Sequence, residues 1–366
     1  MSNQDIAYFA PGPAKLPHAV LAKAQKEIIH YKDTGVSPME LSHRAADFTE
    51  IMNTACSNAR KILNIPNDYK VGFVHGGGTG QFAAVPLNFI KQNSAGADYC
   101  VTGTWSSKAI AEAAKYGKVH KVFSLDRFTD VPAESAWAKR SDASYLYYTD
   151  NETVHGVEYP FIPTPLPGVP LVCDMSSNIM TREFDVSKYS FIYAAVQKNI
   201  GPAGATLVIM KDDMAGNALD ICPTIFNYTT MLKNNSCYNT PPCYNIYMTN
   251  LVFEWILEQG GLIAMEKSMA TKSKLLYDVI DSSNGFYYNN NINPKCRSRN
   301  NVVFRLRNDD EELEAKFVKE AKLQGLYSLK GHRSVGGMRA SLYNAISVND
   351  AERLASFMKA FASANQ

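Results

Sequence analysis

Short apolar runs alternate with longer segments of helical periodicity through the first two thirds of the chain. VGFVH (71–75) has the length of a buried strand, and QFAAVPLNFI (81–90) after it fits a helix. A strand at 97–105 and a helix at 106–117 repeat this order. Further strands are expected at 143–149, 169–174, 190–197 and 205–210. The β-then-α order predicts an α/β fold in which helices cover both faces of a mostly parallel sheet.

The pattern changes towards the C-terminus. We predict one long helix over 251–281, an alternating strand at 301–307 and an amphipathic helix at 310–325. LYSLKG and GGMRASLYNA should form a pair of strands, and a helix near 349–362 should close the chain. The polar, turn-rich segment 227–245 predicts a long loop. The predicted divisions are an N-terminal arm (1–16), a large domain (17–265) and a smaller C-terminal α+β domain (266–366).

Composition narrows the classes of partner. The 366 residues are 46% hydrophobic and 20% charged with a formal charge of +2, and no basic tract points to nucleic acid. No apolar run is long enough to span a membrane, and the N-terminus does not read as a signal peptide. The seven cysteines form no CxxC pair, so we expect reduced thiols, a cytoplasmic location and no metal ion. The expected partners are small molecules and a second copy of the chain.

The glycine-rich segment HGGGTGQF (75–82) lies between a predicted strand and a predicted helix. Consecutive glycines let backbone N–H groups approach an anion, and a helix start adds a favourable dipole. No Lys-Ser/Thr pair follows the glycines, and Gln81 stands where a dinucleotide-binding motif has its last glycine. The segment is typical either of a phosphate site or of a tight strand-to-helix turn.

Two ionisable residues fall at the ends of predicted strands, where open α/β sheets bind ligands. Asp174 ends an apolar strand, and a buried carboxylate there needs a cationic partner. An N-cap or a surface turn is the alternative for this residue. Lys198 stands between two apolar strands, where desolvation lowers a lysine pKa and leaves an amine that forms Schiff bases. A lysine that only extends to solvent at a hairpin is the alternative.

These features have one common explanation. Pyridoxal phosphate carries a phosphate, a pyridine nitrogen that works best protonated, and an aldehyde. The glycine segment, Asp174 and Lys198 match these three groups in turn. Trp105, which we place at a strand end, would stack on the cofactor ring, with ordinary core packing as the alternative. The combination predicts a pyridoxal-phosphate site.

Several segments also resemble one family. The chain is similar over essentially its whole length to the phosphoserine aminotransferases, which are fold-type I pyridoxal-phosphate enzymes. The last of the similar segments is the most specific to that family among aminotransferases. They are GPAKLP (12–17), ELSHR (40–44), HGGGTGQFAAVPLN (75–88), NETVHG (151–156), CDMSSN (173–178), AAVQKNIGPAG (194–204), YNTPPCYNIY (238–247) and KGHRSVGGMRASLYNA (330–345).

The resemblance implies a role for each matching residue around the cofactor ring. Lys198 would bind the aldehyde covalently, and Asp174 would pair with the pyridine nitrogen. Trp105 would stack on the ring, and Thr153 would hydrogen-bond the ring hydroxyl.

The resemblance also implies how the cofactor phosphate is held. Gly78 and Thr79 would bind it, with help from Gln197. Asn239 and Thr240 would reach the phosphate of the neighbouring subunit's cofactor. A homodimer with shared sites follows from that implication.

The resemblance implies an aminotransferase that interconverts O-phospho-L-serine plus 2-oxoglutarate and 3-phosphohydroxypyruvate plus L-glutamate. The reaction would follow ping-pong kinetics and would belong to serine biosynthesis. Both amino donors are anionic at each end, so the site needs cations at each end. Arg339 would take the α-carboxylate, while His43, Arg44, His332 and Arg333 would surround the distal anion. Arginine forks suit carboxylate and phosphate geometry.

Two positions depart from the family pattern. Thr79 stands where many bacterial members have an arginine that contributes to the anion pocket, and Pro11 stands where some have serine. Backbone donors survive the first change, so we expect cofactor binding to be kept.

Two alternatives remain at this point. An aminotransferase of the serine–pyruvate or alanine–glyoxylate type would not need the cations at 43–44 and 332–333. A nucleotide- or phosphate-binding module without covalent chemistry would use the glycine segment but leave Lys198 and Asp174 unexplained.

Overall fold

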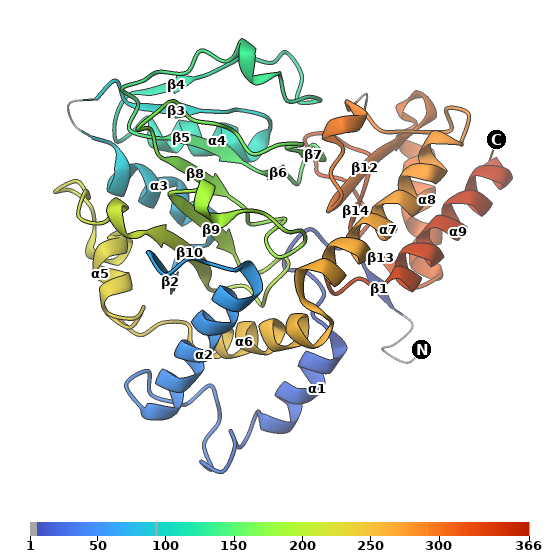
Figure 1. The fold of residues 1–366 in the computed structure, drawn as a ribbon. Coiled ribbons are helices and arrows are strands. Elements are labelled where there is room, and N and C mark those ends of the chain that lie inside the picture. Colours follow the sequence, from blue (N-terminus) through green and yellow to red (C-terminus); the bar gives the residue numbers. More distant parts are fainter. Residues whose placement is uncertain (1–5, 92–93, 291, 366) are drawn as a thin grey trace.

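A seven-stranded sheet occupies the centre of the computed structural model, which describes residues 6–91, 94–290 and 292–365 (Figure 1). The strand order is β2-β10-β9-β8-β5-β3-β4. β10 runs antiparallel to both of its neighbours, and the other pairs are parallel, so the mostly parallel sheet is confirmed. The strands are β2 (Tyr69–Val74), β3 (Ala97–Tyr99), β4 (Val119–Lys121), β5 (Leu146–Thr149), β8 (Leu171–Asp174), β9 (Phe191–Ala195) and β10 (Thr206–Lys211).

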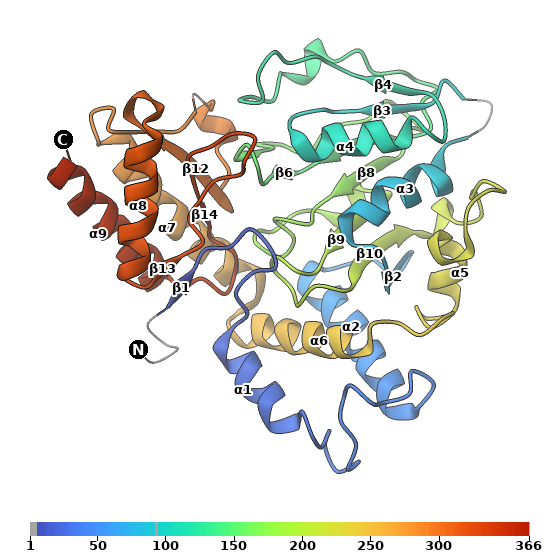
Figure 2. The same ribbon diagram turned by 180° about the vertical axis from the view of Figure 1, so that it is seen from behind.

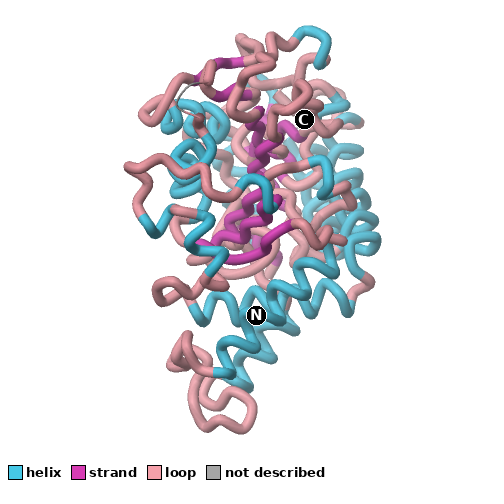
Figure 3. Tube along the Cα trace, turned by 60° about the vertical axis from the view of Figure 1, so that its left-hand side comes forward, coloured by secondary structure: helices cyan, strands magenta, loops and turns pink. Residues whose placement is uncertain are grey.

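Helices cover both faces of this sheet, as its apolar strands require. Alternate side chains of β5 enter different cores: Tyr148 packs with the helices of one face and Tyr147 with those of the other. α1 (His18–Glu27), α2 (Ala46–Leu63) and α6 (Cys243–Glu258) cover the first face. α3 (Gly77–Phe89), α4 (Thr104–Ala113) and α5 (Tyr228–Lys233) cover the second (Figure 2). Figure 3 shows the strands between these helical layers.

A separate hydrophobic core surrounds a small antiparallel sheet near the C-terminus. Its strands are β11 (Tyr287–Tyr288), β12 (Asn301–Leu306) and β14 (Met338–Ser341). Its helices are α7 (Gly261–Asp281), α8 (Glu311–Leu323) and α9 (Val348–Asn365). The start of the chain joins this core, because β1 (Ala7–Tyr8) pairs in parallel with β13 (Leu326–Tyr327).

The single long helix predicted over 251–281 is wrong. α6 ends at Glu258 and α7 begins at Gly261, because Gly260 and Gly261 adopt φ values of +102° and +70° that interrupt an α-helix. α7 contributes Met265 to the core of the large sheet and Met269 to the smaller core. The predicted division at residue 266 therefore falls inside one helix, and we keep the three-part division as a proposal.

Other local predictions also need correction. The strand predicted over 97–105 ends at Tyr99, which places Trp105 in the first turn of α4. The segment 227–245 is not one loop, since it contains α5 and the start of α6. LYSLKG and GGMRASLYNA share one bridge, Lys330 with Met338, while β13 pairs with β1 and β14 with β12.

The connection between β5 and β8 also differs from the predicted alternation. A short hairpin of β6 (Asn151–Glu152) and β7 (Val157–Glu158) replaces a covering helix there. Among the described helices, none combines the length and the apolar character needed to cross a membrane.

Candidate active site

A cavity of about 250 Å³ opens at the carboxyl ends of β8 and β9, beside the small sheet. It brings together most of the residues that the sequence predicted. Those that line it are Gly78, Thr79, Trp105, Thr153, Asp174, Gln197, Lys198, His332 and Arg339. Those that do not are His43, Arg44, Asn239, Thr240 and Arg333.

Lys198 lies in the turn between β9 and β10, with its amine inside the cavity. Burial lowers the pKa of this amine to about 8, although the negative charge of Asp174 acts in the opposite direction. Its Nζ donates a hydrogen bond to Thr153 Oγ1 at 3.1 Å. A neutral fraction of the amine is therefore present near neutral pH and available as a nucleophile or base.

Asp174 is the last residue of β8 and is only 5% exposed. Its Oδ1 accepts a hydrogen bond from the Ser176 backbone N–H at 2.8 Å. Burial raises the pKa of this carboxyl group, and within the described residues it forms no salt bridge. A cationic ring nitrogen placed beside Asp174 would supply the counter-charge that the buried carboxylate lacks.

The glycine segment forms the start of α3, and the helix begins at Gly77 rather than at Gln81. Gly76 takes φ +94° at the N-cap, a conformation that favours glycine, and offers no side chain to cap the helix. The first N–H groups of a helix have no intrahelical acceptor, so those of Gly78 and Thr79 are free to bind an anion at the cavity wall.

Trp105 is held by the start of α4. Its backbone N–H donates to the Glu152 carboxylate at 3.0 Å, and the Ser106 N–H does so at 2.8 Å. Glu152 is fully buried, and burial raises the pKa of its carboxyl group. The indole Nε1 of Trp105 is buried without a partner, so a ligand beside the ring could accept its hydrogen bond.

Arg339 projects from β14 and is only 6% exposed. Its Nη1 donates to the Thr153 carbonyl at 3.4 Å, and its Nε is buried without an acceptor. No carboxylate pairs with it among the described residues, and burial lowers the pKa of its guanidinium. A buried guanidinium with free donors is suited to bind the carboxylate of a ligand.

His332 and Arg333 lie in the loop before β14, and only His332 reaches the cavity wall. The His332 Nδ1 is 2.7 Å from the Ser334 hydroxyl. Burial and the positive charges of Arg339 and Arg333 lower the pKa of His332. His155 is half-buried nearby, with its Nε2 at 2.9 Å from the Thr104 hydroxyl, and desolvation lowers its pKa to about 4.

The remaining predicted residues lie away from this cavity within the same chain. His43 and Arg44 belong to the connection between α1 and α2. Asn239 and Thr240 precede α6, where the Asn239 amide is 3.2 Å from His75 Nε2 and the Asn239 Oδ1 is buried without a partner.

Three residues that shape the site have no role predicted from the sequence. Gly12 lines the cavity with φ +124°, a conformation that favours glycine, and a Cβ there would crowd the Lys198 Cγ at 3.1 Å. Ser176 supports β9 by accepting the Ala195 N–H at 3.0 Å. Glu152 orients the helix that carries Trp105. These residues lie in the segments GPAKLP, CDMSSN and NETVHG. The segments resemble the family, but the residue types of Gly12, Ser176 and Glu152 did not by themselves indicate a function.

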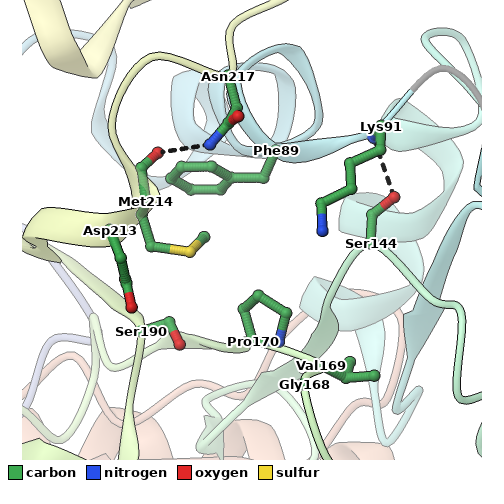
Figure 4. Close-up of a pocket in the computed structure, with 10 residues that line it drawn as sticks. All are labelled: Phe89, Lys91, Ser144, Gly168, Val169, Pro170, Ser190, Asp213, Met214 and Asn217. Carbon is green, nitrogen blue, oxygen red and sulfur yellow. Dashed lines mark hydrogen bonds between the residues drawn. The ribbon is translucent and has the colours of Figure 1, made fainter.

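A second cavity, of about 330 Å³, opens at the opposite ends of the strands (Figure 4). Phe89, Met214 and Pro170 face it, with Lys91 and Asp213 on its walls. Its described lining residues include no glycine-rich helix start and no buried acid like Asp174, so we assign the chemistry to the Lys198 cavity.

The cavity around Lys198 fits the three groups of pyridoxal phosphate. The free N–H groups at the start of α3 suit a phosphate, Asp174 suits a protonated pyridine nitrogen, and Lys198 suits an aldehyde. The unpaired Nε1 of Trp105 adds a further donor at the same wall.

Comparisons with known proteins agree with this geometry. The model of the family "Aminotransferase class-V" matches residues 6–354. The phosphoserine aminotransferase of Drosophila melanogaster is 50% identical over 359 residues, which cover 97% of this chain and 98% of that protein. The structure of a phosphoserine aminotransferase from Bacillus circulans subsp. alkalophilus is 42% identical, with a TM-score of 0.95 and 100% of both chains covered. A PLP-bound phosphoserine aminotransferase from Trichomonas vaginalis is 38% identical, with a TM-score of 0.91 over 97% of this chain and 99% of that chain.

Proposed function

This chain belongs to the class-V aminotransferases, within which its relatives are phosphoserine aminotransferases, and from that premise we propose that it interconverts O-phospho-L-serine and 3-phosphohydroxypyruvate. The amino group passes between this pair and the pair 2-oxoglutarate and L-glutamate, as serine biosynthesis requires. The observation that carries the proposal is the buried pair Lys198 and Asp174 in one cavity with the unpaired guanidinium of Arg339.

Pyridoxal phosphate is the cofactor, and when bound it supplies the electron sink needed for chemistry at the substrate Cα. Lys198 would hold its aldehyde and Asp174 its pyridine nitrogen. Trp105 would stack on the ring, and Thr153 would bond the ring hydroxyl. The phosphate would be held by Gly78, Thr79 and Gln197.

Different residues of the chain transfer the proton and orient the substrate. The Lys198 amine, which is free only after the amino group of the substrate has replaced it on the aldehyde, would accept the proton from the substrate Cα and deliver it to the carbon that bore the aldehyde. Burial lowers the pKa of this amine and so favours its neutral, proton-accepting form. Arg339 fixes the α-carboxylate, which aims the Cα–H bond at this amine. Asp174 keeps its partner nitrogen protonated because the buried carboxylate is otherwise uncompensated.

The distal anion of the substrate would be held by His332 and Arg333, together with His43 and Arg44. The last two do not reach the cavity of their own chain. We therefore propose a homodimer in which His43 and Arg44 of one subunit, with Asn239 and Thr240, complete the site of the other. The buried, unpartnered Oδ1 of Asn239 supports a role for this residue in a contact that one chain does not provide.

We also propose a cytoplasmic location. All seven cysteines lie in the described ranges and are free thiols, which suits a reducing compartment.

Half-reaction spectra test the assignment. The purified protein, loaded with pyridoxal phosphate, is mixed separately with phosphoserine, glutamate, serine and alanine. We expect fast conversion of the cofactor band with phosphoserine and glutamate and slow conversion with the neutral amino acids. Faster conversion with serine or alanine than with phosphoserine would instead favour an aminotransferase for small neutral side chains.

Mixed subunits test the shared site. Lys198→Ala and Arg44→Ala proteins should each be nearly inactive. After unfolding and joint refolding in equal amounts, half of the dimers should be mixed with one intact site each, which restores about a quarter of the original activity. No recovery in a mixture shown to contain mixed dimers would reject the contribution of Arg44 across the interface.

A further inference from the structure

Lys108 is a basic residue next to Trp105, a residue of the cavity wall, and it has no role in the assignments above. It lies on α4, three residues after Trp105, and its Nζ is 4.7 Å from the centroid of the Trp105 ring. Trp105 itself lines the cavity. The ammonium group of Lys108 therefore stands beside the indole that borders the substrate space, while the rest of the lysine is exposed.

Lys108 also lies on the side of the cavity where the distal anion is expected. Its positive charge acts on His332, as do the charges of Arg333 and Arg339. Basic groups from α4 and from the loop before β14 thus act on the same imidazole, although these elements are far apart in sequence. Thr79 at the start of α3 adds no cation to this group.

The charge of these basic side chains is not balanced by ion pairs among the described residues. In the ranges that the structure describes, Lys108, Arg333 and Arg339 form no salt bridge. Lys115, just beyond the end of the same helix, instead pairs with Glu112 at 2.6 Å. Basic side chains that form no ion pair with a carboxylate attract an anion, and more strongly one that carries two charges.

We propose that Lys108 binds the distal phosphate of the substrate and favours this dianion over the carboxylate of glutamate. The inference rests on the proposed function, which supplies the substrate. It adds a residue of α4 to the distal site and makes this residue a determinant of specificity rather than of chemistry. The electrostatic interaction energy is proportional to the charge of the ligand. If the loss of Lys108 raises the half-saturating concentration of a monoanion about threefold, it should therefore raise that of a dianion about tenfold.

The test measures half-saturating concentrations in the half-reactions of the cofactor-loaded enzyme with phosphoserine, glutamate and alanine. Lys108→Met is compared with Lys108→Arg and with Lys115→Met, which removes the same charge from a paired site. Relative to alanine, we expect Lys108→Met to raise the value for phosphoserine about tenfold and that for glutamate about threefold. Lys108→Arg should restore most of the difference, and Lys115→Met should show none.

Salt and direct binding separate this role from a structural one. In about 1 M NaCl the selective effect should shrink, because exposed charges are screened. The affinity of the loaded enzyme for inorganic phosphate, measured by calorimetry, should fall in Lys108→Met but not in Lys115→Met. Equal changes for all three amino acids, or none, would overturn the proposal and leave Lys108 as a support for Trp105. If the unsubstituted enzyme converts alanine but not phosphoserine, the proposed function fails and this inference fails with it.

Discussion

Replacing Lys272 by methionine should destabilise the protein strongly, although the residue lies outside the cavity. Lys272 is on α7 and is 1% exposed. Its Nζ donates to the backbone carbonyls of Leu342, Tyr343 and Ile346 at 2.7, 3.1 and 2.9 Å. These carbonyls belong to the segment between β14, which carries Arg339, and α9.

The expected loss follows from the acceptors that methionine leaves behind. The Tyr343 carbonyl keeps a second donor, the Ile346 N–H at 2.9 Å, so the main loss falls on the other two carbonyls. A buried acceptor without a partner costs about 1–3 kcal/mol. Removing a buried ammonium relieves part of its desolvation cost, because burial lowers the pKa of Lys272 to about 7. We therefore expect a net loss of about 3 kcal/mol.

Lys274→Met is the matched control, since it makes the same exchange two residues along the same helix. Lys274 is exposed and pairs with Asp278 at 2.6 Å, which contributes about 0.3–0.5 kcal/mol. Urea unfolding at pH 6, where the Lys272 amine is charged, should show a midpoint about 1 M lower for Lys272→Met, for a slope of about 3 kcal/mol/M. The control should shift by less than about 0.2 M. Equal midpoints for the two variants would refute the argument that the three carbonyls depend on this ammonium.

Three further predictions concern the site. The rate at which the cofactor-free protein forms a Schiff base with added pyridoxal phosphate should rise about tenfold per pH unit below pH 8 and level off above it, because the Lys198 amine with a pKa of about 8 must be neutral to attack the aldehyde; a rise centred near pH 10 would contradict a buried amine. Asp174→Ala should lower the half-reaction rate by at least about 10²-fold while the protein still unfolds cooperatively, since a neutral ring is a poor electron sink; a rate within about threefold of the original enzyme would exclude the pairing. Glu152→Gln should weaken cofactor affinity about tenfold and change the fluorescence of Trp105, because an amide cannot accept all three hydrogen bonds that the carboxylate receives from Trp105 and Ser106; an unchanged affinity would show that the orientation of α4 does not matter for the cofactor.

The sequence predicted the large sheet well because its strands are short, apolar and buried on both faces. Periodicity predicted the wrong strand pairing where the residues of a strand do not determine which strand it pairs with. Nothing in LYSLKG specifies that Leu326 and Tyr327 pair with a strand more than three hundred residues earlier. The division between α6 and α7 was visible as Gly260 and Gly261, but the apolar spacing continues across both residues and favoured one helix.

Within the site, the sequence found the residues whose chemistry is unusual for their position. A lysine and an aspartate at the ends of apolar strands are costly unless they have a function, so Lys198 and Asp174 could be identified before the fold was known. Gly12 and Glu152 could not, because their importance lies in contacts with distant residues: the Lys198 side chain for Gly12, and the backbone of Trp105 for Glu152. The pattern of residue types also could not show that His43 and Arg44 lie outside the cavity of the chain they belong to.

The N-termini of α3 and α4 explain why the cofactor phosphate and the distal anion of the substrate must bind at different positions. α3 and α4 pack against the same face of the sheet, and each follows a strand of that sheet. At α4 the chain supplies its own anion, since Glu152 accepts the N–H groups of Trp105 and Ser106. At α3 the cap is Gly76, which supplies none, so of these two described helix starts it is the one that offers free N–H donors to a ligand phosphate. The charge of Glu152 also disfavours a second anion at the start of α4, so the distal group of the substrate must be held by side chains at the rim. The basic side chains of the loop before β14 and Lys108, in the second turn of α4, are the ones we propose for this role.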